Sequence, residues 1–323
     1  MTLQEFLIEW NNPDERVLVH TSGSTGTPKP MWVEKSKMLN SARITCDFLN
    51  LQSGDTALLC MPLDYIAGKM VVVRSLERGL ELVQVEPSNH PLAGIHGKEL
   101  VFAAMVPSQV FCSLQVPEER DTLKQIRHLI IGGGAISAEL QTAIRDLHSE
   151  GFIWSTYGMT ETLSHIALRR LNGPTSSEWY TPFDSVRVAL NQEGCLMIDA
   201  PLVHDGVLVT NDLAEIKDGK FRILGRRDNV ICSGGIKLQI EQIEARLQSY
   251  LHVPFCITRR KDAKFGEVVV LLVSGEDVSE KQLHEAFLHL NRYEVPKAII
   301  KVSEIPKTET GKISRAEAEK LAR

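Results

Sequence analysis

The chain has 323 residues, of which 43% are hydrophobic and 24% are charged, and its formal net charge is −5. This length predicts two domains, and the acidic balance offers no basic surface for nucleic acid or for a membrane. No apolar run approaches the roughly 20 residues of a spanning helix. A signal peptide begins with basic side chains, and residues 1–10 contain none. The six cysteines form no CxxC pair. These features predict a cytoplasmic protein without a zinc site or a disulfide framework.

The first three quarters of the chain alternate predicted strands with predicted helices. Strands are expected at residues 16–20, 56–61 and 128–131, and helices at 34–49 and 137–148, the second with Ser137 as its N-cap. This alternation predicts βα units around a largely parallel sheet.

Strand and turn patterns dominate from about residue 194. Strands are expected at 206–210 and 221–224, joined by a hairpin turn at Asp218-Gly219-Lys220. A helix at 238–251, a strand at 268–273 and a helix at 280–291 follow. The change of pattern between Arg227 and Asp228 predicts a large domain of residues 1–227 and a small domain of residues 228–323.

The first predicted strand runs into a loop rich in glycine and hydroxyl residues. Glycine lets a backbone approach an anion, while hydroxyl and N–H groups donate to phosphate oxygens and a lysine adds charge. The loop is not a Walker A sequence, because its lysine follows proline and no Ser or Thr comes next. Taken alone, it fits either a phosphate-binding loop or a solvated turn. Its residues are Thr21, Ser22, Gly23, Ser24, Thr25, Gly26, Thr27, Pro28 and Lys29.

Three later motifs decide between these interpretations. They are Tyr157-Gly158-Met159-Thr160-Glu161, then Thr210-Asn211-Asp212 with Gly225-Arg226-Arg227-Asp228, and finally Pro306-Lys307-Thr308-Glu309-Thr310-Gly311-Lys312. In this order and spacing, the chain resembles the acyl-adenylate-forming (AMP-binding) superfamily, which includes acyl-CoA synthetases, adenylation domains and luciferases.

The resemblance covers nearly the whole chain and implies a fold and a reaction. The fold is an α/β large domain with mixed and parallel sheets and a strand-rich segment, followed by a small, mobile α+β domain. The reaction is that of an acid–thiol ligase, in which ATP and Mg²⁺ convert a carboxylic acid to its acyl-adenylate and coenzyme A then takes the acyl group as a thioester.

The resemblance also implies roles for individual residues. The loop from Thr21 to Gly26, with Lys29, would bind the β- and γ-phosphates. The remaining ATP-site residues would be Gly133, Gly134 and Ala135 in the adenine pocket, Tyr157 and Gly158 against the adenine, Thr160 at the α-phosphate, Glu161 on Mg²⁺, Asp212 on the ribose, and Arg226 on ribose and phosphates.

Three further roles concern the second domain. Asp228 would be the hinge, Gly234 and Gly235 would lie beside the pantetheine arm of CoA, and Lys312 would reach the acid carboxylate and the α-phosphate, where negative charge develops. Each assignment has a structural alternative. A triple glycine can simply end a strand, Asp212 and Arg226 can form a surface ion pair, and a lysine near a C-terminus is often solvated.

The sequence indicates the identity of the acid substrate less directly than it indicates the nucleotide. Tyr65 stands where the family usually has histidine, and Arg74 follows the apolar residues 70–73 of a predicted helix. A buried arginine needs a partner, which could be a second carboxylate of the substrate or a structural acid such as Glu77. Lys69 is a weaker candidate of the same kind.

Together with residues 157–167, these features resemble a short form of the o-succinylbenzoate–CoA ligases of menaquinone synthesis. The second carboxylate of that substrate would meet Arg74, Ser164 or His165, although His165 could equally be a packed core residue.

The phosphate loop starts so early that the usual first subdomain of the family is expected to be absent, with a homodimer as one way to cover the exposed face. The alternatives are a ligase for another aryl or acyl acid, an adenylation enzyme that loads a carrier protein, and a non-catalytic nucleotide-binding protein. The basic residues Arg259, Arg260, Lys261 and Lys264 could bind CoA phosphates or form a solvated surface.

Overall fold

The computed structural model describes residues 1–20, 30–95, 97, 99–275, 278–308 and 312–323. The chain begins with helix α1 (Leu3–Asn11), which starts at a capping box: the Thr2 hydroxyl accepts from the Glu5 amide, and the Glu5 carboxylate accepts from the Thr2 amide. An antiparallel pair, β1 (Arg16–His20) and β2 (Pro30–Glu34), leads into helix α2 (Lys35–Phe48).

A seven-stranded sheet with the order β4-β3-β5-β6-β7-β8-β9 forms the centre of the large domain. The first five strands in that order are parallel, and the last two add antiparallel. The strands are β3 (Thr56–Leu59), β4 (Glu81–Gln84), β5 (Phe102–Met105), β6 (His128–Ile131), β7 (Phe152–Gly158), β8 (His165–Arg170) and β9 (Thr181–Pro182).

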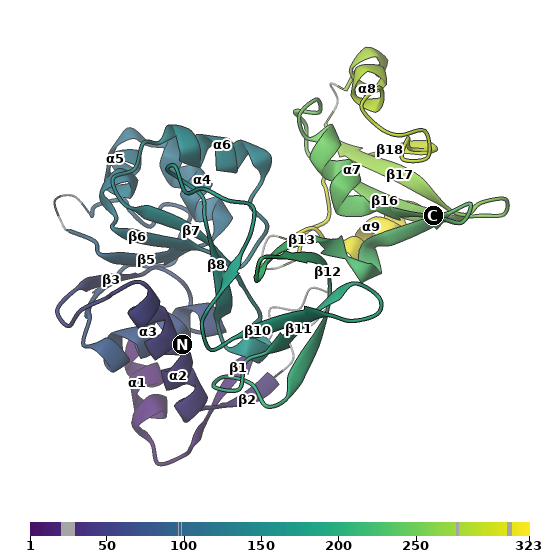
Figure 1. The fold of residues 1–323 in the computed structure, drawn as a ribbon. Helices are drawn as coiled ribbons and strands as arrows, with labels where there is room; N and C mark the ends of the chain where they lie inside the picture. Colours follow the sequence, from purple (N-terminus) through teal and green to yellow (C-terminus); the bar gives the residue numbers. More distant parts are fainter. Residues whose placement is uncertain (21–29, 96, 98, 276–277, 309–311) are drawn as a thin grey trace.

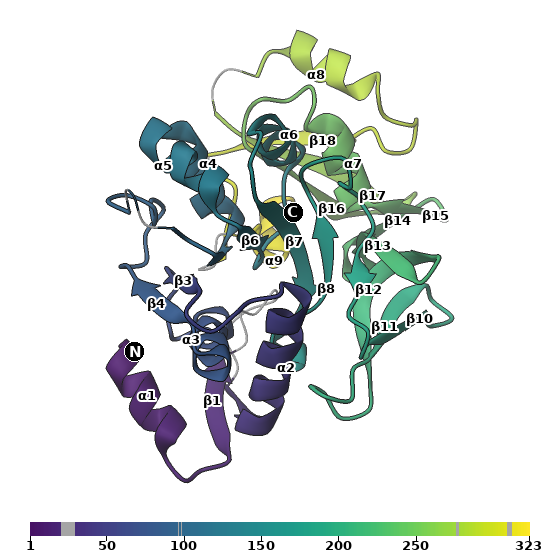
Figure 2. The same ribbon diagram turned by 60° about the vertical axis from the view of Figure 1, so that its left-hand side comes forward.

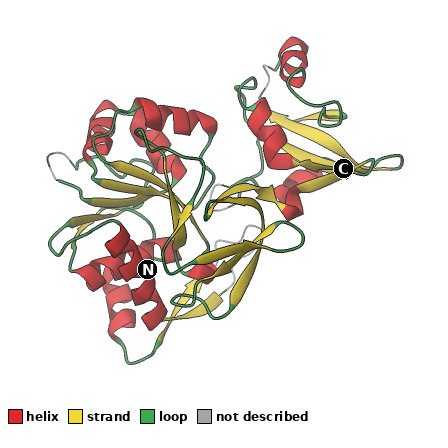
Figure 3. Ribbon diagram, viewed as in Figure 1, coloured by secondary structure: helices red, strands yellow, loops and turns green. Residues whose placement is uncertain are grey.

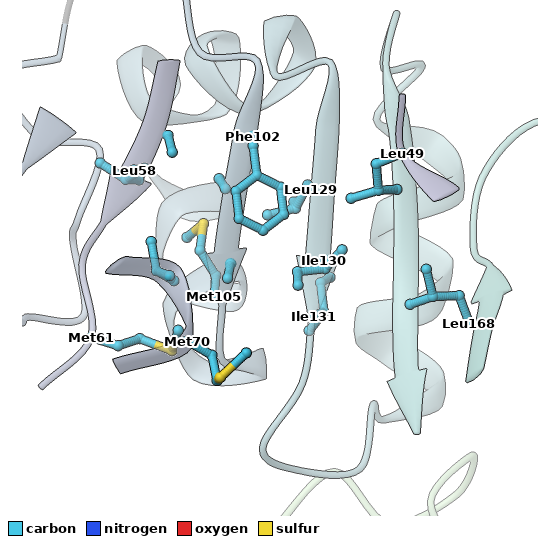
Figure 4. Close-up of a cluster of buried hydrophobic side chains, with 14 of the residues drawn as sticks. Leu49, Leu58, Met61, Met70, Phe102, Met105, Leu129, Ile130, Ile131 and Leu168 are labelled. Atoms are coloured by element: carbon cyan, nitrogen blue, oxygen red, sulfur yellow. The ribbon is translucent and has the colours of Figure 1, made fainter. Parts of the chain in front are cut away.

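Helices cover both faces of this sheet. Helices α4 (Pro107–Gln115), α5 (Pro117–Gln125) and α6 (Ala138–Asp146) lie on one face, and α2 and α3 (Ile66–Arg78) lie on the other (Figures 1 and 2). Because a parallel sheet is covered on both faces, its strands are hydrophobic along their whole length rather than alternating. All four residues of β5 are buried, as are residues 129–131 of β6, and their side chains meet in one core (Figure 4).

A four-stranded antiparallel sheet continues the large domain, with the order β10 (Arg187–Leu190), β11 (Cys195–Asp199), β12 (Val207–Lys217), β13 (Lys220–Arg226). The φ angles of Asp218 and Gly219 are 50° and 73°, the backbone that a two-residue hairpin turn requires. Tyr180 and Phe221 exchange two backbone hydrogen bonds, of 2.7 and 3.0 Å, and so join this sheet to the edge of the seven-stranded sheet. Figure 3 shows how far strands dominate this segment.

The last part of the chain forms a separate α+β unit, which lies apart from the parallel sheet in Figure 1. Its antiparallel strands have the order β15-β14-β17-β16, and β18 pairs parallel with β17. The elements are η2 (Arg227–Asn229), β14 (Val230–Ser233), β15 (Ile236–Gln239), α7 (Ile240–Leu247), β16 (Phe255–Asp262), β17 (Gly266–Ser274), α8 (Glu280–Phe287), β18 (Ala298–Val302) and α9 (Arg315–Leu321).

Most predicted elements are present, with three corrections. The helix expected at 238–251 is shorter, because Leu238 and Gln239 pair with β14 and α7 starts only at Ile240. The helix expected at 280–291 likewise ends early, at Phe287. No strand was predicted at residues 255–262, which form β16 and pair antiparallel with β17 at the end of the strand order. The strands at 16–20 and 128–131 and the hairpin turn are confirmed, and Ser137 caps α6 by accepting from the Leu140 amide. Among the described residues, no helix has the length and apolarity to cross a bilayer.

The buried hydrophobic residues form separate cores on the two sides of residue 228. The large core runs from Phe6 to Phe221, whereas the cores of the last part begin at Ile231. We propose that the domain boundary lies between Arg227 and Asp228, as the sequence predicts.

Two core substitutions test this boundary. Leu129 and Leu271 are fully buried, one in each core, and replacing either by alanine should cost about 2–5 kcal/mol of local stability. In hydrogen exchange, Leu271→Ala should lower protection in residues 231–302 and leave residues 102–131 unchanged, while Leu129→Ala should do the reverse. Equal loss of protection on both sides with either variant would mean a single cooperative unit.

Candidate active site

The carboxyl ends of β3, β6 and β7 meet at one edge of the sheet, because these strands are parallel. The chain continues from β3 to β4 on one side and then returns to place β5 on the other side of β3, so the strand order reverses there. Such a reversal is where open α/β sheets bind ligands. Tyr65, the residue before α3, the Gly132-Gly133-Gly134 turn after β6, and the turn after Gly158 all follow strands that end at this edge.

The glycine turn after β6 needs its glycines. Gly133 has φ of +77°, and a Cβ on Gly132 would lie 2.5 Å from the Thr156 hydroxyl oxygen on β7. Gly133, Gly134 and Ala135 are exposed, so the turn presents bare backbone along the edge. A flat ligand such as a purine ring can approach such a surface closely.

The turn after β7 is tighter still. A Cβ on Gly158 would lie 2.3 Å from the Ser164 carbonyl oxygen, and the Ser164 amide donates to the Thr162 carbonyl over 2.7 Å. Leu163, between them, has φ of 64° and ψ of −35° although it is buried. A γ-turn of this hand is rare for a branched side chain and stores about 1–3 kcal/mol. Just before this turn, Thr160 is buried and Glu161 is exposed.

Asp212 on β12 connects the two sheets. Its carboxylate accepts from the Tyr157 hydroxyl over 2.6 Å and from the Arg226 guanidinium over 3.2 Å, and Arg226 also donates to Asp228 over 2.9 Å. Burial first and then Asp212 raise the pKa of Tyr157, so its phenol stays protonated and donates. Burial alone would lower the pKa of Arg226, but Asp228, Asp212 and Glu241 outweigh that effect and raise it.

Lys312 reaches the same group from the small domain. Burial and the nearby Arg226 lower the pKa of Lys312, while the charge of Asp212 raises it, so the lysine lies within electrostatic range of both. The Lys312 carbonyl accepts from the Thr308 amide over 2.7 Å, and the Lys312 amide donates to the Thr308 hydroxyl over 3.2 Å. These bonds fix the backbone on which the ammonium is carried. Arg226 and Lys312, more than 80 positions apart in the sequence, therefore both lie near Asp212.

A second buried cluster follows from Arg74 on α3. Its guanidinium is 2% exposed and donates to the Ser164 hydroxyl over 2.5 Å, while its Nε atom has no hydrogen-bond partner. Burial lowers the pKa of Arg74 to about 10, which still leaves the guanidinium charged at neutral pH. The expected alternative partner, Glu77, pairs with Arg43 and Arg78 instead. Within the described residues, Arg74 forms no ion pair with any carboxylate.

The hydrogen bonds beyond Ser164 run in one direction. The Thr45 hydroxyl donates to the Ser41 carbonyl over 3.1 Å, so its oxygen accepts from His165 Nε2 over 3.2 Å, and His165 Nδ1 then accepts from the Ser164 hydroxyl over 3.1 Å. Burial, and next the charge of Arg74, hold the pKa of His165 well below its usual value. The network therefore contains a neutral His165 protonated on Nε2. Thr45 was not predicted, since no motif marks its position in α2.

Other predicted residues lie elsewhere. Lys69 is buried against α1, where its ammonium pairs with Glu9 over 3.4 Å, so this cation already has a partner away from Ser164. Gly234 and Gly235, with φ of 59° and 84°, form the tight turn between β14 and β15. Arg259 pairs with Glu319 and Glu267. The predicted phosphate loop, residues 21–29, lies outside the described residues.

Comparison with known proteins identifies the family. A family model described as AMP-binding enzyme matches residues 5–199, which is well over half of the chain. A crystal structure of an acyl-CoA synthetase (AMP-forming)/AMP-acid ligase II-like protein from Dyadobacter fermentans is 35% identical, covers 98% of this chain and 93% of its own, and has a TM-score of 0.66. The chain belongs to the AMP-binding enzymes.

Two further proteins are similar to most of this chain. The 2-succinylbenzoate–CoA ligase of Lactococcus lactis is 26% identical over 329 residues, which span 94% of this chain and 71% of the relative. The o-succinylbenzoate coenzyme A synthetase of Bacillus subtilis, solved with ATP and magnesium ion, has a TM-score of 0.78 at 23% identity and covers 93% of this chain and 69% of its own.

These comparisons confirm the predicted family, fold and enzyme class, an AMP-forming acid–CoA ligase. ATP, Mg²⁺ and CoA are the small molecules of this class. The Glu161 carboxylate fits the role of an Mg²⁺ ligand, because it is exposed on the turn beside Thr160 and enters no ion pair among the described residues. Mg²⁺ is commonly held by one or two carboxylates together with substrate phosphates. The described residues contain no group of three His, Cys, Asp or Glu side chains placed to hold a metal ion.

The neutral state of His165 predicts a dependence of stability on pH. Because its folded pKa lies below the unfolded value of about 6.5, it contributes full stability above pH 6.5 and progressively less as the pH falls below that value. Between pH 7.5 and 5.5 the wild type should lose about 1.4 kcal/mol of unfolding free energy more than His165→Gln. Denaturant titrations at both pH values measure this difference, and parallel losses in the two proteins would contradict a buried neutral histidine.

Proposed function

We propose that this AMP-binding enzyme activates o-succinylbenzoate, forming its acyl-adenylate from ATP and then its CoA thioester. The observation that carries this substrate is the buried Arg74 guanidinium, whose hydrogen-bond partner is a serine hydroxyl and which meets no carboxylate among the described residues. A charge buried in this way is costly unless a counter-charge arrives. The free carboxylate of a dicarboxylic acid would supply it, and a monocarboxylic acid would not.

The position of Arg74 supports this proposal. Ser164, which accepts from Arg74, lies four residues of chain after Thr160, so the hydrogen-bond partner of the arginine is close to the proposed phosphate-binding turn. An acid bound with one carboxylate near Thr160 would direct its other end toward Ser164 and Arg74. The names of the relatives, 2-succinylbenzoate–CoA ligases at about 26% identity, agree with such a substrate.

The nucleotide half of the site divides the work among several residues. We propose that Asp212 accepts from the ribose hydroxyls, that Tyr157, Gly158 and the 133–135 turn border the adenine, and that residues 21–26 with Lys29 hold the outer phosphates. Thr160 would donate to the α-phosphate. Bound Mg²⁺, held at Glu161, would neutralise phosphate charge.

Lys312 is the proposed catalytic residue of the first step. When a carboxylate oxygen attacks the α-phosphorus and the bond to pyrophosphate breaks, negative charge grows on the α-phosphate oxygens. A lysine delivered beside Asp212 and Arg226 stabilises that charge in the transition state more than in the ground state. Asp228 would then be the hinge that removes Lys312 and lets Gly234 and Gly235 approach the CoA thiol arm.

Replacing Lys312 by alanine tests this role. We expect adenylate formation, measured by ATP–pyrophosphate exchange, to fall by about 10²–10³-fold, because one aimed donor is lost from the transition state. ATP affinity, measured by calorimetry, should change only a few-fold. The control is Lys307→Ala, an exposed lysine from the same loop, which should retain exchange activity. Full exchange activity in Lys312→Ala would refute the assignment.

Arg74→Lys tests the substrate. Lysine keeps the charge but loses the planar fork, so KM for o-succinylbenzoate should rise by about 10- to 100-fold while KM for benzoate stays unchanged. Arg78→Lys is the matched control, since Arg78 lies on the same helix and pairs with Asp47 and Glu77. An equal rise for both acids would assign Arg74 a structural role. Turnover with benzoate or a fatty acid but not with o-succinylbenzoate would reject the substrate itself.

A further inference from the structure

The end of β13 is held by a side chain from the small domain. Gln239, the last residue of β15, donates from its amide nitrogen to the Arg226 carbonyl oxygen over 3.0 Å. Its side chain lies flat on Gly225: a Cβ at that position would be 2.3 Å from the Gln239 nitrogen and 2.6 Å from its carbonyl carbon. Gly225 has φ of +150°. The absence of a side chain at Gly225 is therefore what admits Gln239.

This contact occurs where the β12–β13 ladder is irregular. Leu213 pairs with Gly225 but Ala214 pairs with Ile223, so Leu224 bulges out of the ladder. A bulge of this kind redirects the residues that follow it. Beyond it, Arg226 faces Asp212 as a cross-strand pair, and their side chains form the ion pair of the site. Gln239 thus binds the backbone of the residue whose side chain holds Asp212.

Two more side chains extend the contact across the proposed hinge. The Glu241 carboxylate accepts from the Gln239 amide and from the Asn229 amide, the latter over 2.5 Å. Asn229 lies in η2 immediately after Asp228, whose carboxylate pairs with Arg226. We call Gln239, Glu241 and Asn229 the hinge clamp. All three are half-buried, and the charge of Glu241 also acts on Arg226.

We propose that Gln239 is a positioning residue for adenylate formation. The hinge clamp fixes the end of β13 so that Arg226 faces Asp212, and it holds the small domain in the orientation in which Lys312 faces the same pair. This inference rests on the proposed function. A turn about Asp228 would carry Gln239 away from Arg226, so the clamp must open before the CoA step. It therefore favours the first step over the second.

The test separates the two half-reactions. Gln239→Met keeps the length and most of the packing of the side chain but removes the donor. The control is Gln242→Ala, at an exposed position of helix α7, which follows β15 directly. Loss of one neutral hydrogen bond from the adenylating orientation should slow ATP–pyrophosphate exchange by about 3- to 10-fold. The single-turnover conversion of supplied acyl-adenylate and CoA to thioester should stay within about 2-fold or become faster. The control should match the wild type in both.

Each outcome bears on the proposal. Equal slowing of both half-reactions by Gln239→Met would show a merely structural role. An unchanged rate of ATP–pyrophosphate exchange would show that the Gln239 hydrogen bond positions nothing. Either result overturns the inference. Hydrogen exchange of residues 225–231 in the ligand-free protein is a readout that needs no activity. Faster hydrogen exchange in Gln239→Met, but not in Gln242→Ala, supports the hinge clamp even if o-succinylbenzoate is rejected as substrate. Unchanged hydrogen exchange in Gln239→Met contradicts the clamp.

Discussion

The Asp212 carboxylate is the group on which the geometry of the site depends. It accepts a hydrogen bond from Tyr157 at the end of β7 and one from Arg226 on β13, and its charge reaches Lys312 near the C-terminus. Three structural units, the parallel sheet, the antiparallel sheet and the small domain, therefore meet at one carboxylate. In the proposed function, the ribose hydroxyls of ATP would join this group, and nucleotide binding would report on the placement of all three units.

A buried charge dominates the other end of the site. Arg74 is carried on an apolar helix between hydrophobic strands, and a directed series of hydrogen bonds runs from it through Ser164 and His165 to Thr45. This network orients the Ser164 oxygen toward the guanidinium, while burial and then the charge of Arg74 lower the pKa of His165 and so keep it neutral. A site held in this way by neighbouring groups is preorganised, which lowers the entropy lost when an acid binds.

Special backbone positions also occur next to these two groups. Leu163 occupies a strained turn next to Ser164, and Gly158 and Gly225 lie where no Cβ fits. Each of these residues precedes a functional side chain and determines its direction. Strain of this kind persists because the surrounding strands and hydrogen bonds over-determine it. Gly225 in particular allows the small domain to contact the strand that carries Arg226.

The sequence by itself determined the family and the alternation of strands and helices, and it supplied most of the residues proposed for the nucleotide site. It could do so because glycine turns, N-caps and hydrophobic runs are local, and because motifs such as Tyr157–Glu161 combine several special residues in a short stretch. Strand β16 and the shorter helix α7 were not predicted, since strand pairing is set by distant partners rather than by local propensity.

Only the tertiary structure decided which partner each charged side chain takes. The sequence left the partner of Arg74 open between a structural acid such as Glu77 and a carboxylate of the substrate, with Lys69 as a weaker candidate of the same kind. In the fold, Glu77 pairs with Arg43 and Arg78, and Lys69 pairs with Glu9. Within the part of the chain that the structure describes, Arg74 hydrogen-bonds to Ser164 and forms no ion pair. Thr45 and Gln239 belong to no motif and join the site through hydrogen bonds that span long stretches of chain. Charge pairing and burial depend on three-dimensional distance, which a sequence does not contain, and so only the fold separated Arg74 from the other candidate cation, Lys69, at the proposed acid site.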